Sequence, residues 1–133
     1  MVKAEGLKLP FETPDKIAPE TLEVFPYTLP ELKVGRIPKQ LITYTTKEFS
    51  AVCPFSGLPD IATVTIEYVP DKKVLELKSL KYYFLSYRNV GIYQEHATQK
   101  IFADLQKALC PQKLKVTTLY NTRGGLDTTC VLE

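Results

Sequence analysis

One cysteine and one aspartate form a pair that could carry out covalent chemistry. Cys53 opens the segment CPFSGLPD of residues 53–60, whose two prolines and one glycine are typical of a loop. A strand is predicted directly after it, so a rigid scaffold would present the loop side chains. A nucleophilic thiol needs an acid or base nearby, and Asp60 is the only carboxylate in the segment. The pair predicts nucleophilic catalysis, and capping of a turn by Asp60 is the structural alternative.

Two lysines suggest a second site. Lys78 and Lys81 are three residues apart at the start of a predicted short helix. Their ammonium groups can point the same way beside free backbone N–H groups, which is an arrangement that binds phosphate. A solvated basic surface is the alternative, and the spacing alone leaves both interpretations open.

A carboxylate and the only histidine are neighbours at the start of a longer predicted helix. A buried Glu95 could accept two parallel hydrogen bonds from a ligand with adjacent N–H donors, as the edge of guanine presents. His96 cannot build a zinc site alone, and Cys53, Cys110 and Cys130 lack the spacing of zinc ligands. We therefore predict no metal site, reduced thiols, and structural roles for His96, Cys110 and Cys130.

Composition limits the class of protein. The chain has 133 residues, of which 44% are hydrophobic and 24% charged, and these values predict one compact globular domain. The net charge is +2 and the basic residues are scattered, which argues against a nucleic-acid-binding coat. No stretch approaches the roughly 20 apolar residues of a membrane helix, and residues 1–14 do not resemble a signal peptide. We expect a cytoplasmic protein with neither nucleic acid nor membrane as partner.

Prolines divide the chain into an arm and a body. Five of the ten prolines fall within residues 1–30, so this segment cannot form a regular helix. We expect it to pack as an extended arm over the body or over a neighbouring subunit, with a solvated tail as the alternative. Residues 31–133 then form a single catalytic domain.

The body predicts an α+β fold. Alternation and helical spacing place strands at 35–49 and 62–68, a turn into a hairpin strand at 74–77, helices at 79–87 and from 93 to before 110, and strands at 114–120 and 126–132. The order β-β-α-α-β-β predicts one antiparallel four-stranded sheet with both helices on one face. Its two free edges favour a closed ring of identical subunits, and we expect a homo-oligomer.

Together these motifs resemble the NADPH-dependent 7-cyano-7-deazaguanine reductases, the nitrile reductases of queuosine biosynthesis, in their single-module form. The resemblance covers residues 35–132. The motifs that carry it are CP at 53–54 with Asp60, ELKSLKYY at 76–83, SYRN at 86–89 with Gly91, Glu95, and RGG at 123–125.

The resemblance implies a fold, a reaction and a cofactor. The fold would be the tunnelling fold, whose subunits close into barrels and stack as two rings, usually of five subunits each. Cys53 would attack the nitrile carbon of 7-cyano-7-deazaguanine to give a thioimide, and Asp60, kept protonated by desolvation, would supply a proton. Hydrides from two NADPH molecules would then give the 7-aminomethyl product.

The resemblance also implies binding residues. The guanine-like edge of the substrate would be held by Glu95, and the same pocket would be lined by Leu75, Glu76, Leu77 and Gln94. The phosphates of NADPH would be bound by Lys78, Ser79, Lys81 and Arg123. Many relatives carry histidine where this chain has Gln94, so His96 is left out of the catalytic set. The chain lacks a G-x-G-x-x-G fingerprint, and we expect the cofactor at a subunit interface.

Three other functions on the same scaffold need residues that differ from those of the reductase. Amidinotransferases that act on a nitrile in transfer RNA share the cysteine and aspartate but match the lysine motif less well. Zinc-dependent cyclohydrolases need a Cys and His ligand set that one histidine does not offer. A catalytically silent purine-binding module would lack the thiol or the acid, and both are present here.

Overall fold

The computed structural model describes residues 6–7, 9–32 and 37–133. Its elements in chain order are η1 Pro14–Lys16, η2 Pro19–Thr21, β1 Val24–Pro26, β2 Ile42–Val52, β3 Pro59–Val69, β4 Lys73–Leu75, α1 Leu77–Leu85, α2 Gln94–Leu109, β5 Lys113–Arg123 and β6 Leu126–Leu132. β2, β3, α1, α2, β5 and β6 follow the predicted order β-β-α-α-β-β. None of the helices in the described part of the chain is long and apolar enough to cross a membrane.

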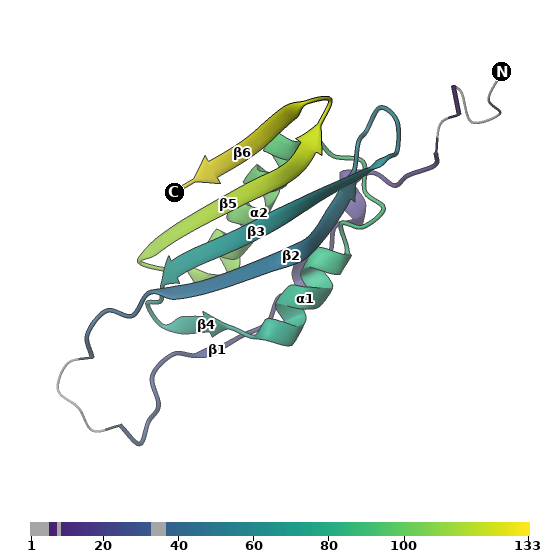
Figure 1. Cartoon of the computed structure of the whole chain (residues 1–133). Coiled ribbons are helices and arrows are strands. Elements are labelled where there is room, and N and C mark those ends of the chain that lie inside the picture. The colour runs from purple at the N-terminus through teal and green to yellow at the C-terminus, as the bar shows by residue number, and fades with distance from the viewer. Residues whose placement is uncertain (1–5, 8, 33–36) are drawn as a thin grey trace.

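The main sheet is antiparallel, with strand order β2-β3-β5-β6. Alternating residues of β3 from Ala62 to Tyr68 are buried, as the sequence predicts for a strand with one covered face. Both helices lie against that face (Figure 1). The α+β class with two helices on one face is confirmed. β2 and β6 are the two edges of this sheet.

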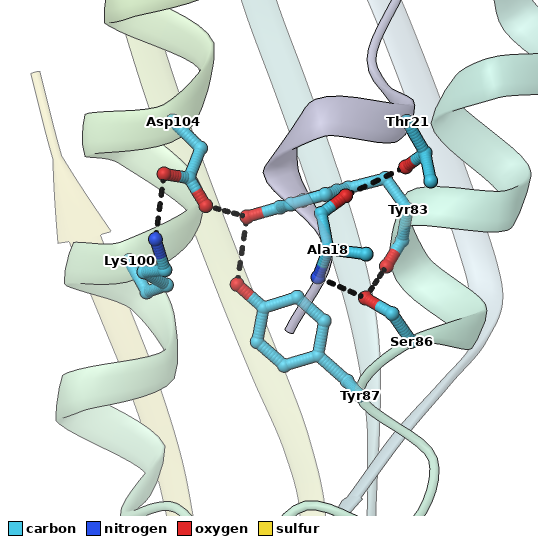
Figure 2. Close-up of polar contacts among 7 residues, drawn as sticks. All are labelled: Ala18, Thr21, Tyr83, Ser86, Tyr87, Lys100 and Asp104. Carbon is cyan, nitrogen blue, oxygen red and sulfur yellow. Dashed lines mark hydrogen bonds and ion pairs between the residues drawn. The ribbon is translucent and has the colours of Figure 1, made fainter. Parts of the chain in front are cut away.

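A buried polar cluster joins the two helices (Figure 2). The Tyr83 hydroxyl of α1 donates to the Asp104 carboxylate of α2 over 2.7 Å and lies 2.7 Å from the Tyr87 hydroxyl. Lys100 completes the cluster with a 2.8 Å ion pair to Asp104. Because Asp104 is both ion-paired and hydrogen-bonded, its burial between the helices is compensated.

The predicted hairpin between residues 62–68 and 74–77 is wrong. β4 pairs with β1 in a separate two-stranded sheet, with Phe25 opposite Val74. The physical reason is that β3 already has β2 on one side and β5 on the other, so its backbone has no free edge for a further strand. A short strand does follow the turn, but its partner comes from the N-terminal segment.

Several element boundaries also differ from the prediction. The first strand of the main sheet begins at Ile42 and runs to Val52, and the expected start at residue 35 lies outside the described residues. α1 begins at Leu77, two residues earlier than expected, because Glu76 caps it. β5 continues to Arg123, so the final turn is the pair Gly124 and Gly125.

The described part of residues 1–30 packs against the body of the same chain. Ile17 is 5% exposed and belongs to the hydrophobic core. Glu12 bridges to Val90 in a parallel arrangement, and a Cβ at Gly91 would lie 2.3 Å from the ring of Phe11. This close approach explains the glycine at position 91. The segment thereby holds the connection between α1 and α2 in place.

Candidate active site

The loop between β2 and β3 fixes the position of Cys53, which directly follows β2. The Cys53 N–H donates to the Leu58 carbonyl over 2.9 Å, and the Gly57 N–H donates to the Cys53 carbonyl over 2.8 Å. Gly57 has φ +74°, and a Cβ there would lie 2.5 Å from the Leu9 carbonyl oxygen. A residue other than glycine would therefore be strained and would clash, which accounts for the glycine in this loop.

Arg123 joins Cys53 to Asp60. Asp60 is the second residue of β3, and its carboxylate points to the helix-covered face, where it is 5% exposed. Nη1 of Arg123 lies 3.0 and 3.1 Å from the two carboxylate oxygens, and Nη2 lies 2.8 Å from Sγ of Cys53. The predicted pair is thus brought together, and one guanidinium contacts both of its members.

The surroundings of Cys53 favour a thiolate. Desolvation by burial acts to raise the thiol pKa, but the backbone N–H groups of Ser56 and Phe55, the Ser56 hydroxyl and Arg123 together lower that pKa below its ordinary value. All of these groups place positive charge or a positive dipole end near the sulfur. The reactive form of the thiol is therefore favoured where the sulfur lies.

The surroundings of Asp60 act on the pKa of its carboxyl in opposite directions. Desolvation raises the carboxyl pKa, and Arg123 opposes this effect through its charge and its hydrogen bonds without cancelling it. A raised pKa matches the expectation that the site desolvates this group. A thiol with a lowered pKa beside an acid with a raised pKa is suited to nucleophilic attack with proton donation.

Cys53 is less open than a loop cysteine was expected to be. It is 4% exposed, although it is not a member of the main hydrophobic core cluster. The Arg123 side chain, which touches its sulfur, is itself 51% exposed. A charged and half-exposed side chain therefore contacts a sulfur that is itself buried.

Tyr120 is a site neighbour that sequence reasoning did not single out. It is 3% exposed on β5, opposite Ala62, and so points to the same face as Asp60. Its hydroxyl has no hydrogen-bond partner within the part of the chain that the structure describes. Burial, together with the charges of Asp60, Cys130 and Glu95, raises its pKa, so the phenol stays neutral. The alternating pattern of β5 predicts that Tyr120 points to the covered face of the sheet, but only the three-dimensional structure reveals the unpaired hydroxyl.

The start of α1 does not offer the free N–H groups that the lysine motif suggested. The Glu76 side chain accepts hydrogen bonds from the N–H groups of Lys78 at 3.0 Å and Ser79 at 2.7 Å. The Ser79 hydroxyl donates to the Glu76 carbonyl and accepts from the Glu23 N–H. Glu76 occupies the place where a phosphate would bind the helix terminus, so that part of the hypothesis is wrong for the chain by itself.

The residues around this helix start lie far from Cys53. The Leu75 N–H donates to the Tyr68 hydroxyl over 3.1 Å, which fixes Leu75 near the far end of β3. Tyr68 lies eight positions beyond Asp60 along β3, and at a strand rise of about 3.3 Å this is about 26 Å. Figure 1 shows β4 and the start of α1 away from the end of the sheet that carries the β2–β3 loop and the β5–β6 turn.

The remaining side chains of this second group differ in exposure. Leu75 is 1% exposed, whereas Leu77 is 57% exposed. Lys78 and Lys81 are both exposed, and neither forms an ion pair within the described ranges. The predicted site residues therefore fall into two groups at different places on one chain.

The start of α2 lies at the Cys53 end of the sheet. The Ile92 N–H donates to the Val52 carbonyl over 3.1 Å, which ties this helix start to the residue before Cys53. Gln94 is half-buried, but Glu95 is exposed rather than buried as a purine ligand would require. His96 is also exposed, with its ring 5.8 Å from that of Tyr93.

The other two cysteines are not core residues. Cys110 is exposed and caps α2 in the left-handed conformation, with φ 44°. Cys130 is half-buried on β6, and all three thiols are free. Cys110 therefore has a structural role, as expected, but it acts by ending α2 and not by packing in the core.

Comparisons with known proteins agree on one family. Residues 59–133 match the family model described as QueF-like protein. The NADPH-dependent 7-cyano-7-deazaguanine reductase of Thermotoga petrophila is 52% identical over 130 residues, which cover 97% of this chain and 89% of that protein. The protein of the same name from Caldicellulosiruptor bescii is 50% identical over 117 residues, covering 88% and 85%. A crystal structure of the archaeosine synthase QueF-Like in the apo form is 28% identical, with a TM-score of 0.66 over 73% of this chain and 94% of that one.

Proposed function

The chain belongs to the family of NADPH-dependent 7-cyano-7-deazaguanine reductases, and we propose that it reduces the nitrile of 7-cyano-7-deazaguanine through a covalent thioimide on Cys53. It is an oxidoreductase that uses NADPH. The observation that supports the catalytic roles is the contact of one guanidinium with both the Cys53 sulfur and the Asp60 carboxylate. The reaction belongs to queuosine biosynthesis, and we place it in the cytoplasm, where thiols are kept reduced.

Covalent attack makes the nitrile reducible. The Cys53 thiolate adds to the nitrile carbon, Asp60 gives its proton to the nitrile nitrogen, and the products are a thioimide and an Asp60 carboxylate. A nitrile accepts hydride poorly, whereas a protonated thioimide accepts it well, so the covalent step divides one difficult reaction into easier ones. Two molecules of NADPH, bound in turn, would each supply one hydride to carry the carbon to the aminomethyl level. The S–C bond breaks in the course of this reduction, so Cys53 returns as the thiolate and the amine product is free to leave.

Substrate recognition is assigned to the start of α2. Glu95 would accept hydrogen bonds from the guanine-like edge, and Gln94 would contact the same ligand. Glu95 is exposed in the single chain, so its burial requires a further wall around the ligand. We propose that a second copy of the chain supplies this wall with its Leu75, Glu76 and Leu77, because within one chain Leu75 is bonded to Tyr68 at the end of β3 remote from Asp60.

The side chains of α1 fit the phosphates of NADPH in part. Lys78 and Lys81 are exposed and three residues apart on one helix, so both ammonium groups are available to an anion. The Ser79 hydroxyl is 8% exposed and already bonded, and its contribution would require an exchange of partners. Arg123 is the fourth proposed ligand and would have to leave Cys53 to reach a phosphate.

The sheet edges support a homo-oligomer. Within the described residues β2 and β6 have no strand on their outer sides, apart from the single bridge of Val52 to Gly91, and the apolar β6 side chains Leu126 and Val131 are 72% and 48% exposed. We propose that β6 of one copy pairs with β2 of the next, so that a ring closes and the two halves of the site meet between subunits. Two stacked rings of five subunits are the proposed assembly, and light scattering on the purified protein tests the subunit count.

Mass spectrometry tests the proposed chemistry. Purified protein mixed with 7-cyano-7-deazaguanine should gain the mass of one substrate per chain, and the loss of NADPH absorbance should begin only when substrate and cofactor are both present. Cys53→Ala should form no adduct, while the matched control Cys130→Ala should form it normally. Formation of the adduct by Cys53→Ala would show that another residue is the nucleophile.

The same experiment separates the alternative functions. An amidinotransferase would form the adduct without consuming NADPH, and a silent purine-binding module would bind the substrate without any covalent mass change. Neither alternative is favoured, because the Thermotoga petrophila reductase is 52% identical to this chain whereas the archaeosine synthase is 28% identical.

A further inference from the structure

Arg123 stands in the way of the reaction that it helps to prepare. Its Nη2 atom lies 2.8 Å from Sγ of Cys53, and its Nη1 atom lies 3.0 Å from Asp60. A nitrile carbon must approach the same sulfur, and the nitrile nitrogen must approach the same acid. Substrate and guanidinium therefore compete for one place.

Local structure allows the Arg123 side chain to leave. It is the last residue of β5, and the pairing of β5 with β6 shifts register between Tyr120 and Arg123. Gly124 and Gly125 follow with positive φ. The side chain is 51% exposed, and the structure shows for it no ion pair other than the one to Asp60 among the described residues. Its departure breaks the contacts to Cys53 and Asp60 but no strand pairing.

The two catalytic groups respond differently when Arg123 leaves. Cys53 keeps the N–H groups of Phe55 and Ser56 and the Ser56 hydroxyl, which belong to its own loop. Asp60 loses its cation and remains desolvated. The other titratable groups that act in this region are Tyr120 on β5, Cys130 on β6 and Glu95 on α2, and none of them is a cation.

We propose that Arg123 is a gating residue that occupies the place of the substrate between the Cys53 sulfur and the Asp60 carboxylate in the resting protein and, on leaving, exposes the sulfur and frees Asp60 to act as the proton donor. This inference rests on the proposed function. When the guanidinium departs, Asp60 takes one proton from solvent and the sulfur becomes accessible. Attack then forms the S–C bond, one C–N π bond breaks, and the Asp60 proton moves to nitrogen, so no oxidant or reductant is needed.

The gate also orders the binding of ligands. Arg123 cannot cover Cys53 and bind a cofactor phosphate at the same time, because a single guanidinium would have to be in both places. An anionic ligand that holds Arg123 away from the sulfur should therefore expose the nucleophile. The probe for this effect is 2′-phosphoadenosine 5′-diphosphoribose, which carries the phosphates of the cofactor but no nicotinamide.

Alkylation of Cys53 measures the accessibility of its sulfur and the ionisation of its thiol separately. The full chain is treated with iodoacetamide across a pH series, and modification of the Cys53 peptide is followed by mass spectrometry. In Arg123→Ala we expect the midpoint of the rate profile to move to higher pH, because the thiolate has lost a cation. We expect the plateau rate above the midpoint to rise on the order of tenfold, because the cover is gone. The phosphate probe should raise the plateau of the wild type in the same direction.

Controls make each outcome decisive. Arg88→Ala removes an exposed arginine of another segment and should leave midpoint and plateau unchanged. Arg123→Gln keeps hydrogen-bond donors without the charge and should show the midpoint shift with a smaller rise of the plateau. A plateau in Arg123→Ala equal to or below that of the wild type overturns the gate. Absence of a nitrile adduct in the wild type would instead overturn the proposed function.

Discussion

Replacement of Tyr120 by phenylalanine should stabilise the protein. The Tyr120 ring is 3% exposed and its hydroxyl has no hydrogen-bond partner among the described residues. Removal of the hydroxyl keeps the packed ring and eliminates the cost of a buried, unsatisfied polar group. Such a cost is about 1 to 2 kcal/mol, which corresponds to a rise in Tm of about 3 to 8 °C for a chain of this length.

Tyr68→Phe is the matched control, and its effect should have the opposite sign. Tyr68 is 0% exposed on the same face of the sheet, but its hydroxyl accepts the Leu75 N–H over 3.1 Å. Phenylalanine at this position leaves that N–H without its acceptor and should cost about 1 to 2 kcal/mol. The two variants should therefore differ by about 2 to 4 kcal/mol in the free energy of unfolding.

Urea unfolding and calorimetry of both variants check this prediction. All samples need the same protein concentration, because association of subunits adds to the apparent stability. A loss of stability in Tyr120→Phe similar to that in Tyr68→Phe would mean that the Tyr120 hydroxyl is paired in the folded protein. The assignment of Tyr120 as an unsatisfied neighbour of Asp60 would then be refuted.

Three further predictions concern the reaction. Asp60→Asn should lower the rate of thioimide formation by about 10²- to 10⁴-fold, because no acid protonates the nitrile nitrogen; rapid-quench mass spectrometry measures this rate, and an unchanged value removes Asp60 from the mechanism. In the wild type the pKa of Asp60 is raised and the pKa of Cys53 is lowered, so the rate should peak between the two. The reactive form of the Cys53–Asp60 pair carries one proton. The rate should therefore fall at lower pH, where the pair binds a second proton, and at higher pH, where the pair loses the proton that it has. Lys78→Ala combined with Lys81→Ala should raise KM for NADPH much more than KM for the nitrile, and an equal rise in both steady-state values would contradict a phosphate site on α1.

Alternation and loop chemistry in the sequence were sufficient to predict the main sheet. Residues 62–68 and 114–120 show period-two patterns, and the structure buries alternate members of each. The partner of β4 could not be predicted in this way. Pairing depends on which strand edges are free, and β1 is a three-residue strand within a proline-rich segment that carries no strand pattern.

The candidate site was predictable in its members but not in its arrangement. Loop composition singled out Cys53 and Asp60, because a thiol and an acid in a proline- and glycine-rich turn are chemically conspicuous. No local pattern links Arg123 to Cys53 across 70 residues of sequence. The occupied cap of α1 was also missed, since glutamate is not among the preferred capping residues and its side chain was assigned to the substrate pocket.

Because of the register of the β2–β3 hairpin, the number of residues between the Cys53 thiol and the Asp60 acid determines which way the acid points. Pro59 is opposite Val52 and points to solvent, whereas Asp60 is opposite Ala51 and points inward. Hydrogen bonds already close the loop tightly, so deletion of one loop residue would have to be absorbed by the start of β3. Asp60 would then take the outward position of Pro59, and Ile61 would face the sulfur. A deletion that leaves all the named site residues in the sequence would thus replace the proton donor with a hydrocarbon.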